Sequence, residues 1–404
     1  TFKEGGTNFT NSLLVGTDTT GTLSSADGNT GVGTGVLAAL TSGDDNVAVG
    51  LNALNDITTG DGNVAIGLET LAKATTADDL TAVGRCALEA NTSGTENTSV
   101  GAYAMRENTT GDKNTALGYA ALQVNLSADQ NTGVGYFALN ANTTGDCNTA
   151  VGKGSLDSNT TGTRNVAVGG EALGANTTAS FNNALGYKAL CSNTTGASNI
   201  AIGTCSMRIN TTGGSNVAVG DKALCANTTG AQITTVGANA LTANTEGHST
   251  VAVGYEALAA NTTAAYNVAV GHRSLKTNTT GASNVAIGRQ ALLDNTTGKC
   301  NIAIGASALA NNTTADNNTS IGTNSMEVNT TGADNTAVGF NSLDANTTGT
   351  DGSALGSSAL TANTTGNSNT AIGRLSLTAN TTGDNNTAVG AGSLLTNTTG
   401  ADNV

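Results

Sequence analysis

A glycine recurs at a constant interval of seventeen residues along almost the whole chain. The series runs from Gly16 to Gly390 and contains 23 glycines, with no residue inserted or deleted between them. A strict short period is typical of a solenoid, in which each unit buries its apolar face only by stacking on its neighbours. The sequence therefore predicts about 23 stacked coils, although 404 residues would otherwise suggest two or three globular domains.

The residues around each glycine indicate what kind of coil is repeated. We number each coil from four residues before its glycine, so that the glycine stands at coil position 5. Position 4 is then Val, Ile or Leu in every coil, position 9 is Leu or Met in all but one, and position 3 is mostly Ala. Seventeen residues are too few for a two-helix repeat, and Val, Ile and Thr at positions 2 and 4 favour strands. We expect an all-β fold, a parallel β-solenoid (β-roll) with a strict 17-residue repeat and two short strands per coil.

The two ends of the chain differ in how closely they follow the repeat. Residues 1–45 deviate from it, and terminal repeats commonly deviate because they cap the exposed sheet edge. We expect degenerate N-terminal coils that form a cap over 1–45 and a regular solenoid over 46–404. The last coils keep the consensus, so we expect this end to be uncapped and the chain to belong to something longer.

Two columns of asparagine run through the coils, at positions 1 and 12. Leu80 and Ile233 replace Asn at position 1, and Leu40 and Ile57 replace it at position 12 of early coils. A position that accepts Leu or Ile in place of Asn is expected to face inward. Stacked inward amides can satisfy each other and the backbone at the corners, so we favour buried asparagine ladders.

The alternative interpretation of position 12 is N-glycosylation, because most of these asparagines begin an N-x-S/T motif. Such acceptors belong on exposed loops of secreted proteins, so the two interpretations cannot hold at the same residue. If this column faces outward, the candidate glycosylation sites are Asn142, Asn159, Asn176, Asn193, Asn227, Asn261, Asn278, Asn295, Asn346, Asn363 and Asn380.

The alanine column at position 3 is a candidate surface for self-association. Neighbouring side chains on a strand point to opposite faces. If the larger residue at position 4 fills the core, the alanine points outward and leaves a flat apolar stripe that requires a partner. The alternative is a tight interior corner where nothing larger fits. The candidate interface residues are Ala150, Ala167, Ala218, Ala252, Ala269, Ala286, Ala303 and Ala337.

The composition argues against several functions. A net charge of −14 leaves no basic patch for nucleic acid, and no apolar run is long enough to insert in a membrane. The two histidines, His248 and His272, have no metal-ligand spacing to a partner, and no coil concentrates acids or bases for catalysis. We predict that the chain is not an enzyme and uses no metal or other cofactor.

Any binding specificity is expected at the variable coil positions 6, 7, 10, 16 and 17, where the sequence shows no concentrated site. Position 13 is threonine in nearly every coil, as at Thr143 and Thr160. Regular threonine files are known on ice-binding solenoids, so ice or carbohydrate binding is a further alternative.

The repeat itself resembles those of a known group of surface proteins. The segments Asn216-Val217-Ala218-Val219-Gly220 and 284–288 resemble the N-S-V-A-I-G repeat of trimeric autotransporter adhesin heads. Similar N-T-A-V-G repeats are found in bacteriophage tail-fibre and bacterial surface proteins. The resemblance implies a parallel β-roll, often trimeric, that is displayed on a cell or virion and binds surfaces. The adhesin repeat is shorter, near fourteen residues, so the N-T-T turn would widen this coil.

These observations together predict a structural or adhesive rod, either a surface adhesin or a tail-fibre shaft. We expect it to be extracellular, on a cell surface or on a virion. Its expected partners are itself, as a homotrimer or a head-to-tail filament, and cell-surface glycans or a host receptor. The main alternative is a self-assembling, N-glycosylated extracellular filament subunit.

Overall fold

The computed structural model describes residues 2–16 and 20–404. The chain divides into two compact units, Thr1–Asn199 and Ile200–Val404. The described residues contain strands and turns but no helix. The strands of the first unit are β1 (Phe2–Gly6), β2 (Phe9–Val15), β3 (Ala26–Asp27), β4 (Thr30–Val32), β5 (Val47–Val49), β6 (Val64–Ile66), β7 (Thr81–Val83), β8 (Thr98–Val100), β9 (Thr115–Leu117), β10 (Thr132–Val134), β11 (Thr149–Val151), β12 (Val166–Val168) and β13 (Asn183–Leu185). Those of the second unit are β14 (Ile200–Ile202), β15 (Val217–Val219), β16 (Thr234–Val236), β17 (Val251–Val253), β18 (Val268–Val270), β19 (Val285–Ile287), β20 (Ile302–Ile304), β21 (Thr319–Ile321), β22 (Thr336–Val338), β23 (Ser353–Leu355), β24 (Thr370–Ile372) and β25 (Thr387–Val389).

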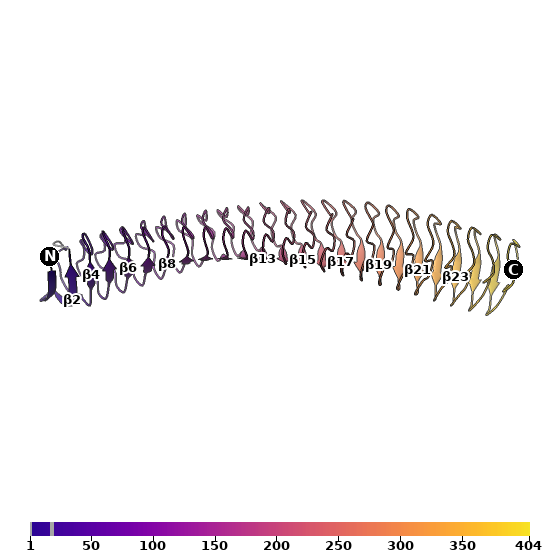
Figure 1. The fold of residues 1–404 in the computed structure, drawn as a ribbon, viewed down its shortest axis with the longest axis horizontal. Helices are drawn as coiled ribbons and strands as arrows, with labels where there is room; N and C mark the ends of the chain where they lie inside the picture. Colours follow the sequence, from indigo (N-terminus) through magenta and orange to yellow (C-terminus); the bar gives the residue numbers. More distant parts are fainter. Residues whose placement is uncertain (1, 17–19) are drawn as a thin grey trace. The chain divides into compact units, whose positions relative to one another are not determined.

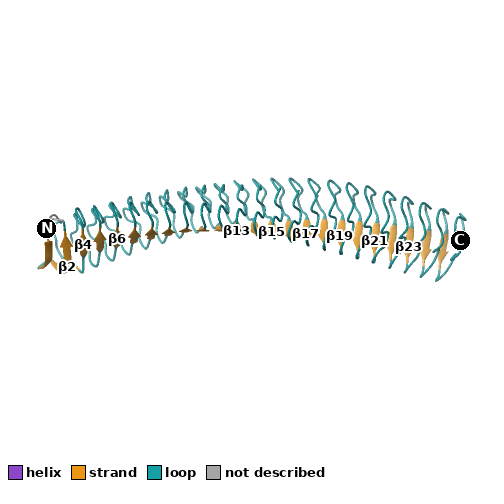
Figure 2. Ribbon diagram, in the orientation of Figure 1, coloured by secondary structure: helices purple, strands orange, loops and turns teal. Residues whose placement is uncertain are grey.

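Each unit is a parallel β-solenoid, as the sequence predicts. From β4 onward every coil contributes one three-residue strand, at coil positions 2–4, and the structure has about 22 turns of about 17 residues. Strands next to each other within a unit pair in parallel and in register, as Val285, Ala286 and Ile287 do with Ile302, Ala303 and Ile304. In each unit the strands follow one another along one side of the stack, and the turns form the other side (Figures 1 and 2).

The prediction of two strands per coil is wrong, because the rest of the coil is built from turns. Three positions outside the strand, 7, 9 and 17, adopt the left-handed backbone region in most coils; Phe137 (φ 55°), Leu139 (φ 53°) and Cys147 (φ 59°) show the pattern. A left-handed residue interrupts an extended strand. Backbone hydrogen bonds nevertheless join coils outside the strands, as from Leu156 N to Ala172 O (3.0 Å) and from Thr160 N to Thr177 O (2.8 Å).

The orientation of the strand is the reverse of the predicted one. In β4–β25 the middle residue, at position 3, is buried, whereas positions 2 and 4 are half-exposed or exposed. The core is therefore made of small residues at position 3, Ala or Ser at position 8, and Leu or Met at position 9. The space at position 3 is narrow, since a Cβ added at Gly133 would lie 3.3 Å from Leu122 Cγ and 3.2 Å from Ala138 O.

The alanine column is consequently not an outer surface, and the predicted self-association stripe is wrong. The column lies in the interior, as in the alternative interpretation, although it also accepts the larger residues Thr235 and Leu14. None of the eight candidate interface residues has exposed surface: Ala150, Ala167, Ala218, Ala252, Ala269, Ala286, Ala303 and Ala337.

The glycine at position 5 is required both by backbone conformation and by space. Gly288 has a φ of +134°, which L-residues rarely adopt. A Cβ at this residue would lie 2.5 Å from Gly305 O and 2.7 Å from Gly305 C in the next coil. The regular glycine therefore ends the strand and lets successive coils approach each other at the corner.

Asparagine side chains form two buried ladders inside the stack, as favoured from the sequence. At position 12, Asn159 Nδ2 donates to Asn142 Oδ1 (2.8 Å) in the preceding coil and to Gly162 O (3.0 Å) in its own coil. At position 1, Asn148 Nδ2 donates to the same Gly162 O (2.8 Å), and Asn165 N donates to Asn148 Oδ1 (3.0 Å). Both ladders thus satisfy the carbonyl at position 15, where the chain turns.

A hairpin covers the N-terminal edge of the first unit. Strand β1 pairs antiparallel with β2, which in turn pairs in parallel with β3 and β4. Within β2, Phe9 and Leu14 are buried. The hairpin is therefore a cap at this end of the solenoid. That the cap extends to residue 45 stays a prediction.

Candidate functional site

The outward side of the strands forms an uncharged surface of aliphatic and threonine side chains in each unit, which we call the strand face. It consists of coil positions 2 and 4 in β4–β25. Its most exposed members include Leu117, Leu185 and Leu355, whose side chains are 48–51% exposed. None of these positions carries a charged residue; they hold Val, Ile, Leu and Thr, with one Asn and one Ser. Large exposed surfaces with many aliphatic side chains and no charge are uncommon on monomeric proteins.

Aromatic residues border this face at position 6, directly after the glycine corner. Five of them are exposed by 44–54%: Tyr119, Tyr136, Tyr187, Tyr255 and Phe340. Tyrosine and phenylalanine are enriched where proteins bind partners because they bury a large area with few rotatable bonds. The strand face and this aromatic border are therefore the main apolar surfaces available to a ligand or partner.

The candidate glycosylation sites were proposed only if position 12 faces outward, and in the structure it faces inward. Each of the eleven asparagine side chains is buried, with at most 1% exposed: Asn142, Asn159, Asn176, Asn193, Asn227, Asn261, Asn278, Asn295, Asn346, Asn363 and Asn380. Their Nδ2 atoms donate along the ladder and to the turn carbonyl. A glycan on such a nitrogen would have to break both bonds and enter the core, so the folded coil has no room for it.

The threonine hydroxyls at position 13 donate hydrogen bonds to backbone carbonyls of the next coil. Thr143 Oγ1 donates to Thr160 O (3.0 Å), and the next threonines repeat this bond. These half-buried hydroxyls therefore serve as braces between coils, and they do not form an array of open donors.

The variable positions do form a concentrated feature, contrary to the expectation from sequence. Tyr119 and Tyr136 stack with ring centroids 5.4 Å apart and an interplanar angle of 13°. Phe137 packs edge-on against Tyr136 (4.3 Å) and Tyr119 (5.7 Å), and Tyr103 packs edge-on against Tyr119 (5.8 Å). We call these four residues the aromatic cluster.

A groove of about 330 Å³ adjoins the aromatic cluster in the first unit. Its lining comes from positions 6, 7 and 10 of four successive coils: Tyr136, Phe137, Lys153, Gly154, Asp157, Glu171, Gly174 and Cys191. Reading residues one by one along the chain misses this groove. Aligning the coils would reveal it, because residues 17 or 34 apart lie in neighbouring coils.

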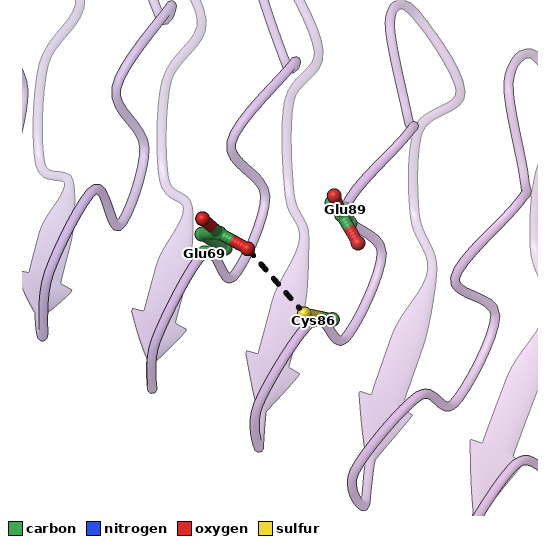
Figure 3. A group of neighbouring side chains, drawn as sticks. All are labelled: Glu69, Cys86 and Glu89. Carbon is green, nitrogen blue, oxygen red and sulfur yellow. Dashed lines mark hydrogen bonds between the residues drawn. The ribbon is translucent and has the colours of Figure 1, made fainter.

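A second group missed from sequence is Glu69, Cys86 and Glu89 (Figure 3). One potential ligand atom from each lies within 4.8 Å of the others. The Cys86 thiol donates to Glu69 Oε2 (3.7 Å), and burial, followed by the nearby Glu89 and Glu69 carboxylates, raises the pKa of Cys86 to about 11. The thiol thus stays protonated at neutral pH, which makes it a weak metal ligand and a poor nucleophile.

Comparisons with protein-family models and with curated proteins found no relative of this chain. No family model matches the chain, and no curated protein matches it significantly. No helix long and apolar enough to cross a membrane is found among the described residues. The fold itself places the chain among the β-solenoid repeat proteins.

Proposed function

We propose that this chain is a structural and adhesive shaft, built from copies of itself that pack through their strand faces. The uncharged strand face is the observation that carries the proposal. It replaces the alanine column as the self-association surface, because the alanines lie inside the coil.

The size of the strand face supports this role. With about 4.8 Å between strands and about 7 Å across a three-residue strand, the ten strands β4–β13 present roughly 340 Å² and the twelve strands β14–β25 roughly 400 Å². A stable interface buries about 800 Å² per partner. Each unit therefore supplies about half of the area of such an interface.

The proposed location is outside the cell, on a cell surface or on a virion. The resemblance of the repeat to adhesin heads and tail fibres supports this location. A lateral homotrimer is the preferred assembly, since the strand face runs along each unit and is available over its whole length.

The experiment measures the mass of the purified chain by light scattering and sedimentation. We expect a discrete particle near three times the 39.4 kDa chain mass. The double variant Ile287→Lys and Ile321→Lys places two charges on the strand face and should shift the particle towards the monomer. The matched control, Thr280→Lys on the exposed turn side, should leave the mass unchanged.

Two outcomes would overturn the proposal. A monomeric wild-type chain at micromolar concentration would show that the strand face does not drive association. Threads of unlimited length that persist in the double variant would indicate end-to-end stacking of coils, and the chain would then be a filament subunit.

A further inference from the structure

We propose that the groove beside the aromatic cluster binds a neutral saccharide. This inference rests on the adhesive part of the proposed function, for which it names the ligand class. The groove uses coil positions 6, 7 and 10, whereas the strand face uses positions 2 and 4. The two surfaces share no residue, so binding and assembly can be tested separately.

The aromatic end of the groove offers a rigid apolar platform. Tyr136 is 48% exposed, and its ring stacks with Tyr119 and makes a T-shaped contact with Phe137. The Arg85 guanidinium lies 4.5 Å from the Tyr103 ring centroid at the other end of the cluster. A platform already held in place loses little conformational entropy when a flat ligand stacks on it.

Two glycines leave the groove open where other coils carry side chains. Gly154 stands at position 7, which is glutamate in the next coil, and Gly174 stands at position 10, which is aspartate in the preceding coil. A Cβ at Gly154 would lie 3.9 Å from Glu171 Cγ, and larger atoms beyond it would fill the hollow. A volume of about 330 Å³ lies at the lower end of the range for ligand pockets, which suits a mono- or disaccharide.

The polar lining is suited to hydroxyl groups. Neither the Asp157 carboxylate nor the Lys153 ammonium forms an ion pair with any described residue. Asp157 is half-buried, and burial raises its pKa above the usual range for aspartate. Glu171 is held in place by Lys188 (3.4 Å). A half-buried carboxylate of this kind can accept hydrogen bonds from the hydroxyl groups of a ligand.

The mixture of charges favours a neutral ligand over an ion. Lys153 opposes a cation, while Asp157 and Glu171 oppose an anion. A neutral sugar presents an apolar face of C–H groups to the Tyr136 ring and hydroxyl groups to Lys153, Asp157 and Glu171. Pockets that combine an aromatic wall with a few placed polar groups are typical of small-molecule sites.

The test uses the full chain and three soluble probes, lactose, cellobiose and N,N′-diacetylchitobiose, measured by saturation-transfer NMR and titration calorimetry. We expect at least one probe to bind and to contact tyrosine protons. Tyr136→Ala should weaken binding at least tenfold, and Gly154→Gln should block it by filling the groove. Tyr255→Ala, which removes an exposed tyrosine at the same coil position in the second unit, should leave the affinity unchanged.

Particle mass, recorded for every variant, separates this proposal from the proposed assembly. Binding that is lost in Tyr136→Ala while the mass is kept would support the saccharide site. Equal binding by Tyr136→Ala and wild type, or no binding of any probe, would overturn it. A wild-type monomer that still binds a probe would overturn the assembly and keep the saccharide site.

Discussion

At the scale of single residues, the interior depends on buried amides whose bonding capacity is almost fully used. Asn159 donates to Asn142 Oδ1 and Gly162 O, and its own Oδ1 accepts from Asn176 Nδ2 (2.9 Å). A buried polar group that loses its partner costs about 1–3 kcal/mol. The ladder therefore stabilises the coil only while every rung is present.

Replacing one rung of the ladder tests this dependence. Asn159→Leu keeps a residue type that early coils use at this position, but it leaves Asn142 Oδ1 and Asn176 Nδ2 short of a partner. We expect the free energy of unfolding to fall by about 2–4 kcal/mol, since two buried groups lose bonds. Chemical denaturation measures the change. The exposed neighbour Thr161→Leu is the control, and an equal effect of both variants would contradict a stabilising ladder.

The half-buried carboxylate of the groove gives a pH-dependent prediction. Burial raises the pKa of Asp157 above its ordinary 3.8, so the folded chain binds this proton more tightly than the unfolded chain. The contribution of Asp157 to stability is therefore present at low pH and is lost as the pH rises through the folded-state pKa. Asp157→Asn should raise the melting temperature at pH 7 and have a smaller effect near pH 4.

Thermal melts of wild type and Asp157→Asn at pH 7 and pH 4 measure these changes in melting temperature. The exposed Asp221→Asn serves as the control for a general loss of negative charge. If both variants respond to pH in the same way, burial of Asp157 does not influence stability. A gain in melting temperature confined to Asp157→Asn would show that the Asp157 carboxylate lowers the stability of the folded chain. Binding sites commonly contain such destabilising groups.

At the scale of the strand, the size of a side chain does not predict whether it points into the core. The sequence predicts that the larger residue at position 4 fills the core, whereas the structure buries the alanine at position 3. The period of seventeen, the parallel register and the buried asparagines could all be predicted, because stacking forces equivalent residues together. The orientation of the strand was missed because only the sizes of positions 3 and 4 were compared. Position 2 lies on the same face as position 4 and is threonine in half of the coils from β4 to β25, which marks that face as the outer one.

The turns and the groove escaped prediction for different reasons. Leucine is a poor residue for left-handed backbone, yet Leu139 and its equivalents adopt it because the turn places the side chain in the core. Nothing in the sequence indicates that conformation. The groove depends on Gly154 and Gly174 lying in neighbouring coils, which a coil-by-coil alignment can show but composition cannot.

A pair of adjacent substitutions tests the strand orientation. Ala286→Leu places a larger side chain in the filled interior and should reduce the free energy of unfolding by about 1–3 kcal/mol. Ile287→Thr alters the exposed face and should change the stability of the isolated chain by about 0.5 kcal/mol or less. Denaturation in conditions that keep the chain monomeric gives both values. The reverse ranking would restore the orientation predicted from size.

At the scale of the whole molecule, contacts within each unit connect coils to their immediate neighbours. Ion pairs such as Lys73–Asp56, Lys113–Glu96 and Arg273–Glu256 join residues seventeen apart. These exposed pairs each contribute little to stability. Their spacing shows that the coil is the unit of construction, so the number of coils should be adjustable.

Deletion of one full coil tests this modular construction. Removing residues 284–300 joins position 17 directly to position 1, and the remaining coils keep their register. We expect the shortened chain to fold with unchanged circular dichroism per residue and a cooperative unfolding transition. Removing 284–299 instead shifts every later residue by one place and should disrupt pairing. Equal tolerance of both deletions would contradict a register fixed by the repeat.

The asparagine ladder of each unit also has an electrical direction of its own. From Asn108 to Asn193 in the first unit, and from Asn227 to Asn397 in the second, Nδ2 donates to the oxygen of the preceding coil. All these amide dipoles point the same way, whereas the hydrogen bonds of parallel strands run in both directions along the stack. Chains of aligned hydrogen bonds polarise one another. The ladder thus has its positive end towards the N-terminal coils, whereas the threonine hydroxyls at position 13 donate to the following coil and form a column of dipoles directed the opposite way.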